Sequence, residues 1–223
     1  MSAIGVLLVF GAVVLMGRFF GAAGLTTWMS LATVLANIIV SKQVTVFGLN
    51  TTLGSILFAS TFLATDIISE VYGEKSSKKA VGIASISSIV FIVTTQYALC
   101  YVPNALDYAS EGMKILFPLS IRVSVASVVM SYVANVADVH LFELLKKKIP
   151  GKLWLRNNIA TIVCNCTENF LFITLAFIGI YSFKDCMMIA LSSSLFETLI
   201  AICDTPFAYI GRKVAKRDWK RRT

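Results

Sequence analysis

Seven long apolar stretches constrain the fold of this chain more than any other feature of its sequence. Each holds about 20 mostly apolar residues, the length that an α-helix needs to cross a lipid bilayer. A backbone inside a bilayer has to satisfy its own hydrogen bonds, so such stretches form helices. The sequence therefore predicts an all-α integral membrane protein with a bundle of about seven transmembrane helices. The predicted spans are residues 2–22, 25–47, 52–72, 80–102, 119–142, 158–180 and 187–210.

The composition fits one membrane domain over residues 1–223. Apolar residues make up 57% of the chain and charged residues only 14%, whereas a soluble domain carries about 25% charged residues. The connections between the spans are too short to form a catalytic or ATP-binding domain. The sequence also has no phosphate-binding glycine loop and no nucleophile elbow. We therefore expect a protein that is not an enzyme and needs no cofactor.

The basic residues alternate between successive connections, which predicts the orientation in the membrane. The N-terminus is expected outside and the C-terminus in the cytoplasm, with residues 211–223 as a basic cytoplasmic tail. No basic stripe with interleaved aromatic residues is present, so nucleic acid is not an expected partner. The cations assigned to the cytoplasmic side are Arg18, Lys75, Lys78, Lys79, Lys146, Lys147, Lys148, Lys152, Arg156 and seven in the tail; Lys114 and Lys184 fall on the other side.

The five cysteines and one histidine form neither a zinc-binding pattern nor a disulfide framework. Cys164 and Cys166 are two residues apart, so on a helix they point to different sides. We expect free thiols and no metal site.

Several ionisable residues lie inside the predicted spans, where a charge costs about 2.5–3.5 kcal/mol on insertion scales. Glu168 and Glu197 are each within two residues of a span centre, about 3 Å along the helix axis, and cannot reach water at either surface. This depth favours a substrate site, a proton site or both, although internal pairing of charges is an alternative. Other ionisable residues inside the spans include Asp66, Glu70, Asp138, Asp204, Lys42 and Arg122.

Polar side chains accompany the two glutamates. Thr161, Asn165 and Glu168 follow one another at spacings of four and three, which places them on one face of a helix. Asn37 lies in the middle of the second span. A polar stripe in a membrane helix faces either a cavity or another helix. The predicted substrate-binding residues are Glu168, Asn165, Asn37, Thr161 and Glu197, and the candidates for coupling or gating are Asp66, Glu70, Asp138, Asp204, Lys42, Arg122 and Arg156.

Five sequence motifs occur in order along the chain. They are Ala36–Lys42 (ANIIVSK), Phe62–Gly73 (FLATDIISEVYG), Asp138–Phe142 (DVHLF), Leu153–Asn158 (LWLRNN) and Asp204–Phe207 (DTPF). Each motif alone is weak, but their order and spacing together are fairly specific. Together they resemble the queuosine precursor transporter family, also called the vitamin uptake transporter family, of bacterial inner membranes, and the resemblance covers about Leu31 to Lys213.

The resemblance implies a multi-pass transporter that imports 7-deazaguanine precursors of the tRNA nucleoside queuosine. It also implies a six-helix core, to which the first span adds an N-terminal helix. Members of the family usually have Gln followed three residues later by Asp in the sixth span, where this chain has Asn165 and Glu168. Each position keeps its chemical type but changes its length by one methylene. The exact precursor, or a related small heterocycle, therefore stays open.

Two other functional classes also stay open. One is a substrate-capture subunit of an energy-coupled uptake complex, for which Ala32 and Ala36 could form a docking face. The other is an intramembrane hydrolase using Asp66 and Glu70, although no nucleophile–base pair is visible. The expected partners are a deazaguanine-like base and the lipid bilayer, with a homodimer or a coupling subunit as open alternatives.

Overall fold

The computed structural model describes residues 2–39, 42–46, 49–117, 121–177 and 179–222. Six of its helices are long and apolar enough to cross a membrane, which confirms the predicted all-α membrane fold. The long helices are α1 (Ser2–Ile39), α2 (Gly54–Tyr72), α3 (Glu74–Leu99), α5 (Ile121–Lys148), α6 (Leu153–Phe177) and α7 (Phe183–Arg222). The shorter elements are α4 (Ser110–Leu116) and the strands β1 (Gln43–Val46) and β2 (Leu49–Thr52).

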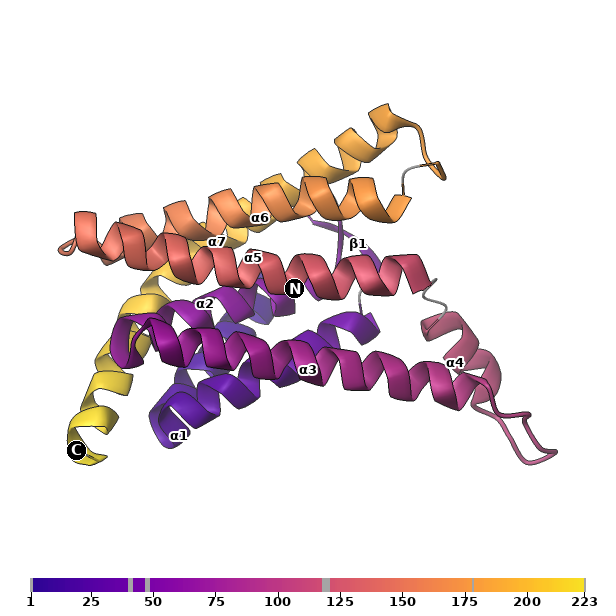
Figure 1. Ribbon diagram of the computed structural model, residues 1–223, viewed down its shortest axis with the longest axis horizontal. Helices are drawn as coiled ribbons and strands as arrows, with labels where there is room; N and C mark the ends of the chain where they lie inside the picture. The colour runs from indigo at the N-terminus through magenta and orange to yellow at the C-terminus, as the bar shows by residue number, and fades with distance from the viewer. Residues whose placement is uncertain (1, 40–41, 47–48, 118–120, 178, 223) are drawn as a thin grey trace.

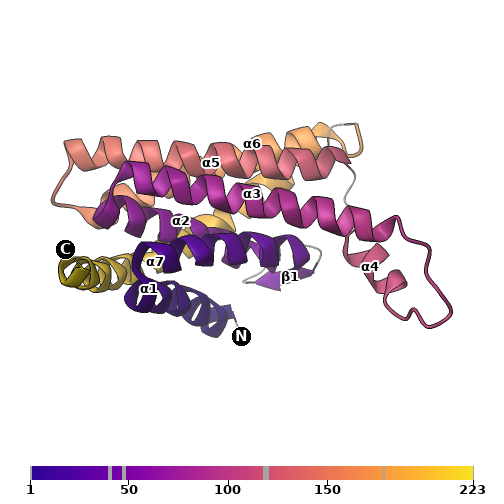
Figure 2. The same ribbon diagram turned by 60° about the horizontal axis from the view of Figure 1, so that its bottom comes forward.

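Helix α1 contains the first predicted span and the second as far as Ile39, and it bends sharply between them at Gly21. This residue has φ 60° and ψ −138°, a conformation that is open to glycine and strained for other residues. The two halves then approach so closely that a Cβ on Gly24 would lie 2.3 Å from the carbonyl oxygen of Met16. Figure 2 shows α1 folded back on itself. Two glycines therefore create the bend and allow the close approach after it.

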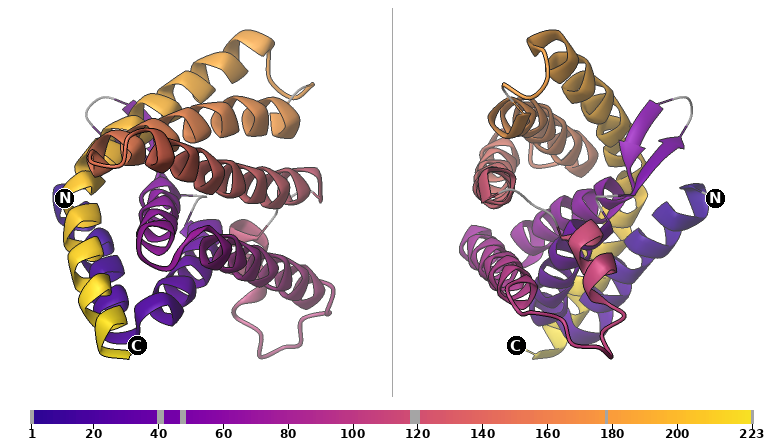
Figure 3. Two further views of the ribbon diagram at one scale, coloured as in Figure 1. Left: turned by 60° about the vertical axis from the view of Figure 1, so that its left-hand side comes forward. Right: turned by 90° about the vertical axis from the view of Figure 1, so that its right-hand side faces the viewer.

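The first half of α1 belongs to the packed core. Phe10 and Val13 are fully buried, and the ring centroid of Phe10 lies 5.5 Å from that of Phe207 in α7. Figure 3 shows α7 beside α1 in two views. Burial of large apolar side chains is the main stabilising contribution to such packing. The N-terminal helix is thus an integral part of the bundle.

The prediction for the second span is wrong at its C-terminal end. The helix stops at Ile39, and β1 pairs with β2 as an antiparallel hairpin, with Gln43 opposite Thr52 and Val46 opposite Leu49. β-branched residues are frequent in both strands, and they favour extended backbone over helix. Lys42 consequently lies outside any helix, at the base of the hairpin, with an exposed side chain.

Helices α3, α5, α6 and α7 extend beyond the predicted spans into the polar connections, whereas α2 stays within its span of 52–72. Helix α3 begins at Glu74 rather than at 80, α6 begins at Leu153, and α7 continues to Arg222. Hydropathy marks only the part of a helix that lies in lipid, whereas the hydrogen-bonded helix continues into water. Most of the predicted basic tail is therefore the last turns of α7.

Helix α2 forms the centre of the bundle. It packs against α1, α3, α5, α6 and α7, and 83% of its most apolar 18-residue segment is buried. The α2–α3 and α5–α6 connections lie at one end of the bundle, and α4 and the α6–α7 connection lie at the other (Figure 1). This arrangement matches the predicted alternation. The assignment of the basic end to the cytoplasm remains a prediction.

Candidate substrate-binding site

A cavity of about 140 Å³ lies among the six long helices. Two glutamates, three amides and several hydroxyl groups line it, together with a few apolar side chains. Such a mixture of apolar surface and a few polar groups is typical of a small-molecule site. The polar lining residues are Thr33, Asn37, Ser55, Thr61, Ser85, Ser88, Ser127, Ser131, Asn135, Glu168, Asn169 and Glu197.

Glu168 and Glu197 both face this cavity. They are 9% and 5% exposed, and their carboxylates are close enough to repel each other. Glu197 is held by Asn169, whose Nδ2 donates to Oε2 at 2.8 Å, and by a hydrogen bond from Ser55. Glu168 receives no hydrogen bond from the described part of the chain. It therefore retains free acceptor capacity at the cavity wall.

Asn37 also lines the cavity, as expected for a binding residue. Its Nδ2 donates to the Ser88 hydroxyl at 3.1 Å and to the carbonyl of Thr33 at 3.0 Å. These contacts fix the amide plane and leave the side-chain oxygen as an acceptor. Asn37 is thereby oriented by α3 before any ligand binds.

The other two predicted binding residues do not line the cavity. The Thr161 hydroxyl contacts Oδ1 of Asp138 at 3.5 Å. Asn165 is 1% exposed, and neither of its side-chain polar atoms has a hydrogen-bond partner among the described residues. The single predicted stripe on α6 is therefore divided between two layers of the protein.

Several lining residues were absent from the predicted site. Asn169 follows Glu168 directly, reaches the cavity and orients Glu197. In α5, Ser127, Ser131 and Asn135 line the cavity at successive spacings of four. This helical spacing was readable in the sequence. Single serines, in contrast, carry too weak a signal to identify a site.

Three buried aspartates lie between the cavity and the basic end of the bundle, next to Asn157 and Thr161 of α6. Asp66 of α2, Asp138 of α5 and Asp204 of α7 are 2%, 0% and 1% exposed. Asn157 Nδ2 donates to Asp204 at 2.8 Å, and the Thr65 hydroxyl approaches Asp138 at 3.5 Å. Neither oxygen of Asp66 has a hydrogen-bond partner in the described part of the chain. We refer to these three residues as the aspartate layer.

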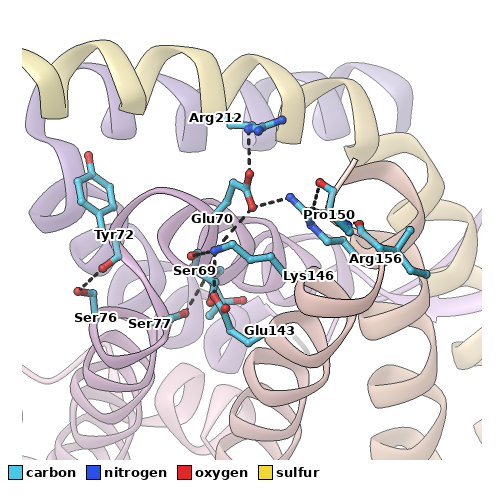
Figure 4. A network of polar contacts seen from close by, with 12 residues as sticks. Ser69, Glu70, Tyr72, Ser76, Ser77, Glu143, Lys146, Pro150, Arg156 and Arg212 are labelled. Atoms are coloured by element: carbon cyan, nitrogen blue, oxygen red, sulfur yellow. Dashed lines mark hydrogen bonds and ion pairs between the residues drawn. The ribbon is translucent and has the colours of Figure 1, made fainter. Parts of the chain in front are cut away.

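Beyond the aspartate layer, Glu70 forms a network with three cations from three helices (Figure 4). Its Oε2 lies 2.5 Å from Nη2 of Arg156 and 3.8 Å from Nζ of Lys146, and its Oε1 lies 2.9 Å from Nε of Arg212. Arg156 also donates to the carbonyl of Pro150 at 2.8 Å. The Glu70 network therefore joins α2 to α5, α6 and α7 at the basic end of the bundle.

Two predicted gating residues do not belong to this arrangement. Lys42 lies between α1 and β1 with an exposed side chain, whereas the Glu70 network joins α2 to α5, α6 and α7. Arg122 lies in the first turn of α5, but its side chain is outside the described residues. The network instead takes its cations from α5, α6 and α7.

Comparisons with known proteins assign the chain to a family. The family model described as "Putative vitamin uptake transporter" matches residues 52–211. The chain is 31% identical over 210 residues to the "Probable queuosine precursor transporter" of Bacillus subtilis (strain 168), covering 92% of this chain and 91% of that protein. It is 26% identical over 187 residues to the "Queuosine precursor transporter" of Escherichia coli (strain K12), covering 78% and 80%. No solved structure matches the chain significantly.

These matches confirm the resemblance seen in the sequence motifs. The matched region runs from β2 into α7 and contains most of the cavity, the aspartate layer and the Glu70 network. Both relatives are transporters by name, which agrees with the prediction that the chain is not an enzyme. The chain is a multi-pass membrane transporter and belongs to the vitamin uptake transporter family.

Proposed function

We propose that this protein imports queuosine precursors, the 7-deazaguanine bases, across a bacterial inner membrane, and that the cavity is its substrate site. The free acceptor capacity of the buried Glu168 side chain at the cavity wall is the observation that carries this proposal. A deazaguanine presents its N1–H and its exocyclic amine along one edge. One carboxylate can accept both hydrogen bonds, each contributing about 1.5–3 kcal/mol when the acceptor is charged.

The remaining lining groups suit the rest of a deazaguanine. Asn37 and Asn169 offer amide groups for the lactam and pyrrole edges, and both are already oriented by neighbouring side chains. Phe58 and Phe172 line the cavity and could pack against the ring face. Phe62 does not line the cavity and is fully buried against Phe58.

The Glu70 network would close the pathway at the basic end. Substrate that leaves the cavity toward the basic end has to pass the aspartate layer first. It can then leave only if α2 moves apart from α5, α6 and α7. Glu70 ties α2 to these three helices, and Arg156 and Glu70 are 1% and 5% exposed. By this reasoning the structure is closed at the basic end, and release requires the network to open. If the basic end is cytoplasmic, release completes import.

The docking face proposed for an energy-coupled complex receives no support from the packing. Ala32 is 1% exposed, and Ala36 lines the cavity, so neither residue is available to a partner in the membrane. Uptake by the purified protein alone in liposomes distinguishes a complete transporter from a capture subunit, which would bind substrate without transporting it.

The test is uptake of labelled 7-cyano-7-deazaguanine, 7-aminomethyl-7-deazaguanine and queuine by cells that cannot make queuosine. Wild type is expected to restore queuosine in tRNA from at least one of them, and Glu168→Gln is expected to lose this activity while inserting normally. Glu111→Gln is the matched control, because Glu111 lies on the exposed helix α4. No restoration from any of the three compounds by wild type would refute the assigned cargo.

A further inference from the structure

The three carboxyl groups of the aspartate layer lie close together without a cation of their own. Asp66 is within electrostatic range of both Asp138 and Asp204. Among the described residues, Arg156 is the cation that acts on Asp66, but its Nη2 is engaged by Glu70 and its Nη1 by the carbonyl of Pro150. The layer thus holds three acids whose charges the described residues do not balance.

Three ionised carboxylates in this position would be strongly unfavourable. The effective cost of burying an unpaired ion is several kcal/mol even after relaxation, and nearby like charges repel one another further in a low-dielectric interior. Asp66 has no hydrogen bond from the described residues to offset this cost. The observed packing is therefore stable only when the layer carries bound positive charge.

The groups around the layer favour a proton over a metal ion. Among the described residues, no group of three or more His, Cys, Asp and Glu is placed to hold a metal ion. The hydroxyls of Thr65 and Thr161 approach Asp138 only at 3.5 Å. A proton needs one carboxyl oxygen rather than a coordination sphere, so it neutralises an acid without drawing these groups together.

Asn165 supplies an independent indication that the layer binds something. Thr161 and Asn157 lie one and two turns before it on α6 and contact Asp138 and Asp204, so Asn165 shares their face. It is 1% exposed, yet its amide nitrogen and oxygen have no partner in the described part of the chain. An amide can donate to an ionised carboxylate or accept from a protonated one, which suits a site that changes its protonation.

We propose that Asp66, Asp138 and Asp204 form the binding site for a proton that is transported together with the substrate. The site lies between the cavity and the Glu70 network, and Asp66 is within electrostatic range of Glu70 and Arg156. The other ionisable groups that face it are Arg156 and Glu70 on the side of the network and Cys164 on α6. Loss of the proton would leave Asp66 charged and in competition with Glu70 for Arg156, which weakens the contact that closes the basic end. The proton enters with the substrate from one side and leaves on the other.

The transport role of this site rests on the proposed function, so the experiment separates the two. Purified wild type, Asp66→Asn, Asp138→Asn and Asp204→Asn are placed in liposomes with the labelled precursor that supports uptake. One assay measures accumulation driven by a pH gradient, acid on the entry side. The other measures exchange of labelled for unlabelled precursor at equal pH. Glu111→Gln is again the control.

If one proton moves with each substrate, wild type is expected to accumulate substrate about tenfold for each unit of pH difference. One pH unit is a tenfold ratio of proton concentration, and coupling transfers this ratio to the substrate. The aspartate variants are expected to lose accumulation and retain exchange. Wild-type accumulation that ignores the pH gradient, or that follows a sodium gradient at equal pH, would overturn the proposal. So would an unchanged response in all three variants.

A second measurement tests whether the aspartate layer holds a proton, even if no precursor is transported. Infrared spectra of the purified protein at neutral pH are expected to contain the C=O stretch of a buried carboxylic acid, which weakens in at least one aspartate variant and is unchanged in Glu111→Gln. Absence of this band from wild type means that the layer holds no proton, and refutes the proposal. Failure of exchange in wild type together with a positive infrared result refutes only the assigned cargo.

Discussion

Replacing Glu70 by Gln tests how much the network at the basic end contributes to stability. Gln has nearly the same shape as Glu but no charge, so the change removes the shared anion from three cations. Arg156 is affected most, because it is 1% exposed and its Nε already lacks a hydrogen-bond partner among the described residues. Lys146 and Arg212 are 29% and 35% exposed and can turn to water.

The expected loss follows from these exposures. Breaking a buried ion pair by removing one partner costs about 3–5 kcal/mol, whereas each partly exposed pair contributes about 0–1 kcal/mol. The Gln side-chain oxygen still accepts one hydrogen bond, which offsets part of the loss. We expect Glu70→Gln to lower the free energy of unfolding by about 3 kcal/mol, nearly all of it through Arg156.

The matched control is Glu143→Gln, since Glu143 pairs only with Lys146, at 3.1 Å, among the described residues. We expect this change to cost less than about 1 kcal/mol. The assay is unfolding of purified protein by SDS in lipid–detergent micelles, followed by circular dichroism. A double-mutant cycle with Arg156→Met isolates the pair. Equal losses for Glu70→Gln and Glu143→Gln, or additive losses in the cycle, would refute the reasoning.

Three further predictions concern the backbone and the core. Gly24→Ala is expected to reduce the yield of folded protein strongly, because its Cβ would collide with backbone atoms of the opposing half of α1. Gly11→Ala is the control, since a Cβ at Gly11 meets open space, and it is expected to fold normally. Size-exclusion chromatography of both variants measures the yield of folded protein. Phe10→Ala is expected to cost about 3–5 kcal/mol, against little change for Phe19→Ala, whose side chain is 62% exposed; equal stabilities would mean that the first half of α1 is not part of the core. Gly73→Ala is expected to cost about 1–2 kcal/mol, since φ is 86° at the α2–α3 connection, and an unchanged unfolding midpoint would contradict this.

Local properties of the sequence were sufficient to predict the membrane class, most of the spans and the alternation of the connections. A transmembrane helix satisfies its own backbone hydrogen bonds, so apolar length alone identifies it without knowledge of its neighbours. The same reasoning singled out Glu168, Glu197 and the three aspartates, because a buried acid is costly wherever the helix packs. Local sequence did not predict the hairpin after Ile39, since an apolar β-branched run is compatible with either a strand or a helix.

Only the tertiary structure decided which of these residues meet. Glu70 and Arg156 are 86 residues apart in sequence, and no periodicity within one helix predicts contact between them. Asn165 lies within one turn of Glu168 on the same face of α6, yet only Glu168 reaches the cavity, because the two residues lie at different depths along the helix and the neighbouring helices determine what each depth faces. The sequence by itself determined the helices and the polar residues inside them. Packing between helices determined how those residues divide into a cavity, an aspartate layer and an ion network, because it depends on contacts that lie far apart along the chain.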